Sequence, residues 1–367
     1  MTYRHMAKLM STATLMIGVA APAYAAQPVP EEQEAQAANQ EVNTRTPADD
    51  NQPTEIVVTA QKRAQTLIDV PQAVSVIGGA ALEQQHADTF SDYLKLVPGL
   101  QIDESTPGAS RLIVRGVNTG GVASTVGVYV DETPFGSSSG LANGAVLAGD
   151  FDTFDLDRIE VLRGPQGTFY GASSLSGVLK FITRLPSTTG VTVRGRVGVE
   201  AVDGGDMGYY GNLAANLPLT DDLAFRASGT YRKNGGFIDS IGTGGSDRAK
   251  NINDSKSYGG RGSLLYRPTD AISLRLSAIV QNIKADASSV IESDPDTLER
   301  LYGRLSQSQF IPQFTDVKYR VYNGTATFDL GFADLTSSTS YGTQKQQLRG
   351  DLTNGLSPLI TTIFGVP

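Results

Sequence analysis

The chain has 367 residues, no cysteine, two histidines and a formal net charge of −8. Without cysteine and with so few histidines it lacks the ligands of a zinc centre, and its acidic balance argues against a nucleic-acid partner. A nucleophilic triad would have to use His86, which falls at the flank of a predicted helix. We therefore expect a protein that is not an enzyme and that carries neither a metal nor another cofactor.

The first 25 residues have the pattern of a secretory signal peptide. Arg4 and Lys8 precede an apolar stretch over residues 9–21, and small residues follow at Ala23-Tyr24-Ala25. The apolar stretch is too short to cross a bilayer as a helix. We expect cleavage after residue 25, so residues 1–25 are excluded from the fold and the chain is exported.

Residues 26–54 form a polar tether. Six acidic residues against Arg45 give this segment a net charge of −5. It has almost no large apolar side chain, so it cannot bury enough surface to offset the entropy lost on ordering. We expect it to be disordered.

A short β-forming segment follows at residues 55–60, with the sequence Glu55-Ile56-Val57-Val58-Thr59-Ala60. Its β-branched residues favour a strand, and an unpaired strand offers its N–H and C=O groups to another chain. One interpretation is that a partner protein adds a strand here. The other is that the segment is the ordinary first strand of the domain that follows.

Residues 64–186 are predicted to form one compact domain that mixes helices and strands. A helix is expected over residues 80–85, and a second begins with the capping box Thr89-Phe90-Ser91-Asp92 and ends at Pro98-Gly99. Apolar runs between Gly-rich turns predict strands at residues 70–77, 112–115, 126–130, 158–162 and 177–183.

Two features of this domain invite a ligand-binding interpretation. Asp150, Asp152, Asp155 and Asp157 are closely spaced, but the glycine and the glutamate of a calcium loop are missing, so a solvated turn is expected. The glycines of the loop after residue 163 lack the spacing of a nucleotide-binding motif. Turn geometry explains them better.

Residues 157–171 closely resemble the hallmark segment of the plug domain of TonB-dependent outer-membrane receptors, with the turn Gly164-Pro165-Gln166-Gly167 at its centre. Residues 172–175 depart from the polar pair that is usual in the family. The resemblance implies that residues 55–60 are the TonB box, to which TonB would add a strand in the periplasm. Further segments similar to plug sequences are residues 112–116, 128–132 and 176–183.

Beyond residue 186 the chain changes to long strands in which apolar and polar residues alternate. Runs of about ten residues with one apolar face are typical of transmembrane barrels, although a soluble sandwich shows the same alternation. The clearest runs are residues 191–201, 223–232 and 272–280.

The connections between these strands favour a barrel. A transmembrane barrel has short periplasmic turns and long extracellular loops, and short and long connections alternate here in that way. The short turns are residues 218–222, 268–271 and 331–334, and the long loops are residues 234–257 and 281–317.

We expect about seven such strands in residues 190–367, which is too few to enclose a domain. The chain is therefore expected to be the N-terminal portion of a receptor, with an incomplete barrel. The resemblance implies that Arg115 and Arg163 of the plug pair with barrel carboxylates, which we expect on strands absent from this sequence. Arginines expected to face the lumen and to pair mainly with the plug are Arg194, Arg196, Arg226, Arg232, Arg261 and Arg275.

The resemblance implies an α+β plug domain followed by antiparallel transmembrane β-barrel strands. It also implies a receptor in the outer membrane of a Gram-negative bacterium, in contact with lipid, that takes up a scarce bulky solute with energy delivered by TonB. A siderophore, cobalamin or an oligosaccharide would fit such a receptor, and the sequence does not choose among them. Two alternatives remain: a passive pore or surface-binding protein, and a non-functional truncated receptor fragment.

Overall fold

The computed structural model describes most of the chain beyond residue 55. The expected tether, Glu55 and nearly all of the expected signal peptide lie outside the described residues. No helix within the described part is long and apolar enough to cross a membrane. The described residues are 13–15, 56–87, 89–117, 123–135, 151–242, 248–294, 296–351, 353 and 363.

The described residues between 56 and 183 form a domain, called here the inner domain, around a five-stranded sheet. The strands β10 and β7 are parallel and the other neighbours are antiparallel. All five residues of β7 are buried, as expected for an apolar run at the centre of a domain. In sheet order the strands are β4 (Ala73–Gly78), β9 (Leu156–Arg163), β10 (Gly177–Thr183), β7 (Val126–Val130) and β8 (Thr133–Pro134).

Short helices and two hairpins complete the inner domain. The predicted capping box is confirmed, because the N–H of Thr89 donates to the Asp92 carboxylate at 3.0 Å. The strand β5 was not predicted. The helices are η1 (Leu67–Asp69), α1 (Gly79–Gln84), α2 (Phe90–Leu94) and α3 (Gly167–Tyr170), and the hairpins pair β2 (Val57–Val58) with β3 (Gln65–Thr66) and β5 (Leu100–Thr106) with β6 (Ala109–Val114).

Seven long antiparallel strands follow within the described residues, and we call this sheet the wall. Each strand pairs with the next long strand along the chain. The long connections contain β14 (Asp239–Ser240) and β17 (Ser306–Gln307), which pair with each other in parallel. The wall strands are β11 (Thr192–Ala201), β12 (Met207–Pro218), β13 (Leu223–Asn234), β15 (Ser255–Thr269), β16 (Ile272–Ala285), β18 (Phe314–Asp329) and β19 (Asp334–Arg349).

The strand β1 (Ala13–Leu15) pairs antiparallel with β11, from Ala13 against Val199 to Leu15 against Val197. These three residues belong to the expected signal peptide. Cleavage after residue 25 would remove β1 and free this edge of β11, and that cleavage stays a prediction.

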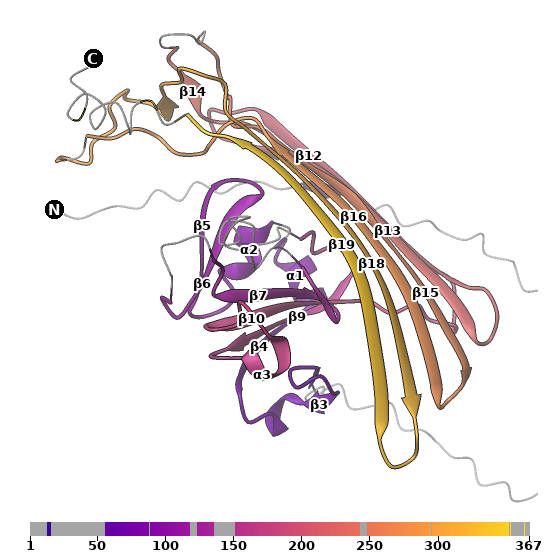
Figure 1. Ribbon diagram of the computed structural model, residues 1–367. Coiled ribbons are helices and arrows are strands. Elements are labelled where there is room, and N and C mark those ends of the chain that lie inside the picture. The colour runs from indigo at the N-terminus through magenta and orange to yellow at the C-terminus, as the bar shows by residue number, and fades with distance from the viewer. Residues whose placement is uncertain are drawn as a thin grey trace, which may run out of the picture.

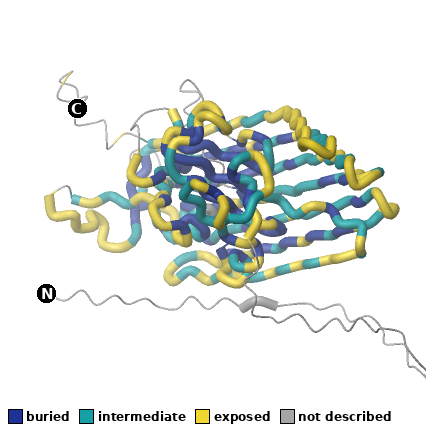
Figure 2. The backbone as a smooth tube through the Cα atoms, turned by 90° about the horizontal axis from the view of Figure 1, so that it is seen from below, coloured by how far each residue is buried: buried dark blue, intermediate teal, exposed yellow. Residues whose placement is uncertain are grey.

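The wall is an open, curved sheet, and the inner domain lies on its concave side (Figure 1). The hairpin β5–β6 lies toward the end of the wall that carries the long connections, whereas α3 and β3 lie toward the short turns (Figure 1). Figure 2 shows buried stretches gathered in the compact part of the molecule, while the wall strands alternate in exposure.

One apolar core joins the two parts. The ring of Phe135 in the inner domain lies 4.5 Å from that of Tyr319 in the wall, measured between centroids, and both side chains are buried. The convex face of the wall, by contrast, exposes apolar side chains such as Val193, Leu213 and Leu276. The wall therefore has an apolar outer face and an inner face against which a domain packs.

Candidate functional site

The β-forming segment at residues 56–60 is partly docked on the inner domain. Ile56 and Val57 are 47% and 44% exposed, whereas Val58 and Ala60 are fully buried in a small apolar cluster. The segment forms one strand of the hairpin β2–β3 and lies at the edge of the inner domain rather than in the middle of its sheet. It is thus available to a partner along only part of its length.

Thr59 is held by two charged residues from neighbouring strands of the inner sheet. Its N–H donates to the Glu160 carboxylate at 3.0 and 3.2 Å. Its hydroxyl accepts a hydrogen bond from Lys180 Nζ at 2.8 Å. Glu160 on β9 and Lys180 on β10 are register partners, and both side chains are fully buried. Buried charges are costly unless they are paired, so this position is a strongly specified contact.

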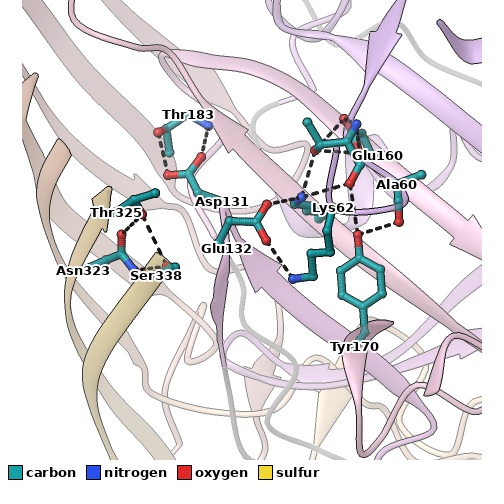
Figure 3. Close-up of polar contacts among 12 residues, drawn as sticks. Ala60, Lys62, Asp131, Glu132, Glu160, Tyr170, Thr183, Asn323, Thr325 and Ser338 are labelled. Carbon is teal, nitrogen blue, oxygen red and sulfur yellow. Dashed lines mark hydrogen bonds and ion pairs between the residues drawn. The ribbon is translucent and has the colours of Figure 1, made fainter. Parts of the chain in front are cut away.

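Further groups extend this contact into a network. Glu132 accepts from Lys180 and from Lys62, each at 2.7 Å. The Tyr170 hydroxyl donates to the carbonyl of Ala60 at 2.9 Å. Figure 3 shows Lys62, Glu132, Glu160, Tyr170 and Ala60 converging in this way. The network ties the end of the segment to the strands β9 and β10, to the turn between β7 and β8, and to the helix α3 of the inner domain.

The Gly164-Pro165-Gln166-Gly167 turn serves this site indirectly. Gly164 has φ +101°, a conformation that glycine adopts without strain, and its N–H donates to the carbonyl of Ser176 at 2.9 Å. Gln166 is buried, and α3 begins at Gly167. The turn thereby brings Tyr170, the last residue of α3, under the docked segment.

Tyr170 is fixed from both sides. The hydroxyl of Tyr129 donates to its carbonyl at 2.6 Å, and the ammonium of Lys62 lies 4.4 Å from the centroid of its ring. Burial, together with the charges of Glu132 and Glu160, raises the pKa of Tyr170 well above its ordinary value. Its hydroxyl therefore stays protonated and remains a donor to Ala60.

A second set of charged contacts joins the inner domain to the wall. Asp155 binds Arg226 of β13 and, at 2.7 Å, Arg194 of β11; Arg194 also reaches Glu83 at 3.1 Å. Asp155 is 4% exposed, so the expectation of a solvated turn is wrong at this residue. Burial alone would raise the pKa of Asp155, but the hydrogen bonds and charges of the arginines hold it below its ordinary value.

A matching contact lies nearby on β16. Arg275 binds the carboxylate of Asp131, which also accepts from the N–H and hydroxyl of Thr183 at 2.9 Å each. Arg261 of β15 donates to the carbonyl of Phe154. The prediction that wall arginines face the inner domain is thus confirmed for Arg194, Arg226, Arg261 and Arg275.

The two arginines predicted to pair with barrel carboxylates, Arg115 and Arg163, lie outside these ion pairs between the inner domain and the wall. Arg115 follows β6 with φ +53°, and its N–H donates to the carbonyl of Gly99 at 2.7 Å. Arg163 ends β9, and its Nε is buried without a hydrogen-bond partner. Among the described residues, the ion pairs across this interface join wall arginines to inner-domain carboxylates, and neither Arg115 nor Arg163 takes part.

A cavity of about 170 Å³ lies between the two parts, toward the long connections. It is lined mainly by polar residues from both sides, and burial raises the pKa of one of them, Glu104. The inner domain contributes Thr89, Ser91, Glu104, Pro107 and Asp152, and the wall contributes Arg232, Asn234, Ser255, Lys256, Ser257 and Ile283.

Glu160 and Lys180 were not predicted as site residues from the sequence. A signal was present, because each charged residue lies between two apolar residues of its strand, as in Ile159-Glu160-Val161 and Leu179-Lys180-Phe181. A charge at the centre of a buried strand has to find a partner. The pattern therefore indicated a polar contact, although not its partner.

Comparisons with known proteins agree with this architecture. Residues 66–178 match the family model described as the TonB-dependent receptor plug domain. A vitamin B12 transporter, BtuB, from Vibrio vulnificus (strain CMCP6) is 27% identical over 185 residues, which cover 50% of this chain and 28% of the relative. A hemin receptor from Yersinia pestis is 33% identical over 129 residues, or 35% of this chain and 18% of the receptor.

Solved structures share the fold. The ferric yersiniabactin uptake receptor FyuA from Yersinia pestis superposes with a TM-score of 0.60 at 18% identity, over 76% of this chain and 42% of that one. The alcaligin receptor FauA from Bordetella pertussis superposes with a TM-score of 0.56 at 16% identity, over 80% of this chain and 42% of that one. The chain spans less than a third of the length of the two curated relatives. Residues 66–178 thus match the plug domain of the TonB-dependent receptors, and the chain resembles these receptors, with the inner domain corresponding to their plug and the wall to antiparallel strands of an incomplete barrel.

Proposed function

We propose that this chain acts in the outer membrane of a Gram-negative bacterium as a receptor that imports a bulky solute, with energy delivered by TonB. The observation that carries the proposal is the partly exposed strand β2 at the edge of the inner domain, with Ile56 and Val57 open to solvent. TonB would pair with residues 55–60 by adding a strand. Tension on this segment would then act on the inner domain through Thr59.

The outer face of the wall supports a membrane location. Apolar side chains on this face alternate with inward polar ones, as in transmembrane barrels. Tyr209, Tyr231 and Tyr258 stack across three neighbouring strands near the long connections, with ring centroids 5.9 and 6.5 Å apart. A row of tyrosines at one level is typical of the boundary between lipid and water.

The solute class is proposed from the relatives and from the cavity. The relatives named above are described as a vitamin B12 transporter, a hemin receptor and a ferric yersiniabactin receptor, all of which handle bulky molecules. The 170 Å³ cavity is lined from both the inner domain and the wall. A solute bound at this end of the interface would contact both parts, and so would bias their relative arrangement.

The experiment is a deletion of residues 55–60 with a length-matched deletion of residues 33–38 in the tether as the control. Cells would be supplied separately with cyanocobalamin, hemin and a ferric siderophore, and uptake would be followed for each. We expect the deletion of residues 55–60 to abolish energised uptake of the transported probe, and the tether deletion to leave it intact. Uptake that persists without residues 55–60 would instead favour a passive pore.

A further inference from the structure

Arginine and serine side chains form a chequered patch on the inner face of three neighbouring wall strands. Arg226 of β13 lies beside Ser263 of β15, which lies beside Ser277 of β16. Two residues further along β13, Ser228 lies beside Arg261 of β15. A guanidinium can only donate hydrogen bonds, and a serine hydroxyl can donate one. This patch, called here the arginine–serine patch, therefore presents mainly donors to the inner domain.

The inner-domain carboxylates at this patch already have arginine partners. Asp155 accepts hydrogen bonds from Arg226 and from Arg194, and Asp131 accepts one from Arg275. The side chains of Asp155 and Asp131 are only 5% and 17% exposed. The hydrogen bonds of both carboxylates are thus directed toward β11, β13 and β16, and not toward the arginine of β15 that lies between them.

Arg261 is that arginine of β15. Its Nη2 donates to the carbonyl of Phe154. Within the described part of the chain, its Nη1 is buried and has no hydrogen-bond partner. The charges of Asp131, Asp152 and Asp155 act on Arg261 only through space. A buried cationic donor without an acceptor is costly, so an anion placed at Nη1 would stabilise the fold.

A cavity of about 30 Å³ adjoins Arg261 and the three serines of the patch. The oxygen of Ser263 accepts from Nε of Arg275 at 3.1 Å, which leaves the Ser263 hydrogen to donate elsewhere. Guanidinium groups outnumber carboxylates in the lining, so the cavity has an excess of positive charge and of donors. The charged residues that line it are Arg184, Arg226, Arg261, Arg275, Asp131 and Asp155.

The volume of the cavity limits what can occupy it. One water molecule takes up about 30 Å³ of liquid water, so a monatomic ion fits, whereas phosphate, sulfate or a carboxylate ligand is too large. A water molecule would fill the space but would leave the charge of the arginines uncompensated. The size and the charge of the cavity together favour a small anion.

We propose that the arginine–serine patch and the inner domain enclose a binding site for a halide ion, which is chloride in the natural environment. Arg261 donates to the ion from Nη1, and the hydroxyls of Ser228, Ser263 and Ser277 supply further donors. The ion compensates the guanidinium and so strengthens the attachment of the inner domain to the wall. The site goes beyond the proposed function, because it needs neither residues 55–60 nor a transported solute.

The first experiment locates the ion directly. The full chain, purified in detergent, is crystallised in sodium bromide, and anomalous diffraction is measured at the bromine absorption edge. We expect an anomalous peak within hydrogen-bond distance of Nη1 of Arg261. Water gives no such signal, so a map without a peak in this cavity, or with peaks on the exposed surface alone, overturns the proposal.

The second experiment measures the effect of the ion on stability. The Tm of the full chain is compared in sodium chloride and in sodium gluconate at the same ionic strength, because gluconate is too large for the cavity. A ligand that binds only the folded chain raises its stability by mass action. We expect the Tm to be about 2 °C higher in chloride. Equal Tm values in the two salts overturn the proposal.

Arg261→Met separates this site from general effects of salt. The substitution keeps a long unbranched side chain but removes the donor, so the difference between the two salts should disappear. Arg320→Met is the control at an arginine of β18 outside the cavity, which donates to the carbonyl of Gln281 at 3.1 Å, and it should keep the difference. A difference that persists in Arg261→Met shows that chloride acts elsewhere and overturns the proposal.

Ser277→Ala decides the matter if Arg261→Met does not fold. It removes a hydroxyl from the lining of the cavity and leaves every charged group in place. A smaller effect of chloride than in the parent supports the site, and an unchanged effect overturns it. Because these assays contain neither TonB nor a transported solute, their outcomes are independent of the uptake experiment that tests the proposed function.

Discussion

Arg226 of the wall binds both carboxylate oxygens of Asp155 in the inner domain. Its Nε lies 2.8 Å from Oδ2, and its Nη2 contacts Oδ1. The Asp155 side chain is 5% exposed and that of Arg226 is 11% exposed, so water screens the pair weakly. Together with the Arg275–Asp131 pair, this contact fixes the inner domain against the concave face of the wall.

Asp155→Asn should loosen this attachment. The substitution leaves Arg226 without the charge that compensates it and leaves Arg194 with Glu83 alone, and breaking a buried ion pair typically costs about 3–5 kcal/mol. We expect the free energy of unfolding to fall by about this amount, measured by denaturant titration in detergent micelles. The stabilisation that the Asp155 carboxylate provides is fully present above its ordinary pKa of 3.8. It is lost as the pH falls through the lower pKa that Asp155 has in the folded chain.

Asp157→Asn is the matched control for this variant. Asp157 lies two residues away, and its side chain is 51% exposed beside Arg158. Exposed ion pairs contribute at most about 1 kcal/mol, so the control should change stability only slightly. Equal losses in the two variants would mean that Asp155 does not anchor the inner domain.

Much of the wall could be predicted because alternation is a local property. Over most of the wall, one face of a strand meets the inner domain and the other is apolar, so the period of two appears directly in strands such as β11 and β13. The same period placed Arg194, Arg226 and Arg275 on the inner face. The strand β5 escaped prediction because Gln101, Asp103 and Glu104 interrupt its apolar pattern.

The pairing partners could not be predicted in the same way. The local sequence around Asp155 predicts a solvated turn. Its partner Arg226 lies on β13, about seventy residues later in the chain, so the ion pair is not visible in the local pattern. Thr59 and Glu160 are likewise separated by 101 residues. Such contacts depend on the complete topology, which a single sequence does not reveal through local patterns.

Gly177→Ala should disturb the inner sheet. A Cβ at this position would lie 2.5 Å from the carbonyl oxygen of Leu162 on β9, and a backbone atom cannot move aside as a flexible side chain can. We expect a loss of about 1–3 kcal/mol in the free energy of unfolding, as for other overpacked sites. Thermal unfolding followed by circular dichroism measures the loss.

Gly167→Ala, ten residues earlier in the hallmark segment, is the control. A Cβ at Gly167 would meet no atom within 4 Å, and its φ is not in the left-handed region. Alanine also favours the first turn of α3 more than glycine does. The expected change is within about 0.5 kcal/mol or slightly stabilising, and a loss as large as that of Gly177→Ala would contradict the steric explanation.

Asp286 should make stability depend on pH. Burial and the neighbouring Asp254 raise the pKa of Asp286 from 3.8 to about 6, against the opposing charges of Lys256 and Lys233. Between these two pKa values the folded chain holds a proton that the unfolded chain releases. The protonated Asp286 therefore stabilises the fold fully below about pH 4, and this stabilisation disappears as the pH rises through about 6.

Asp286→Asn should remove that part of the pH profile. We expect the Tm of the parent to fall between pH 4 and pH 7 relative to the variant, by only roughly 2 °C because solvent reaches the group and weakens the effect. Asp296→Asn, in the exposed loop before β17, supplies the control. If Tm depends on pH in the same way in the parent and in Asp286→Asn, then Asp286 and Asp254 do not share a proton.

Leu213→Arg tests the orientation of the wall. Leu213 lies midway along β12, is 59% exposed on the outer face, and is flanked across the sheet by Gly195 and Gly229. If this face meets lipid, an arginine near the midplane should cost about 2–4 kcal/mol of stability in a bilayer. Leu298→Arg, at a loop residue that is 77% exposed, should cost little. Unfolding by urea from lipid vesicles compares the two, and similar small losses would show that the outer face of β12 is in contact with water rather than with lipid.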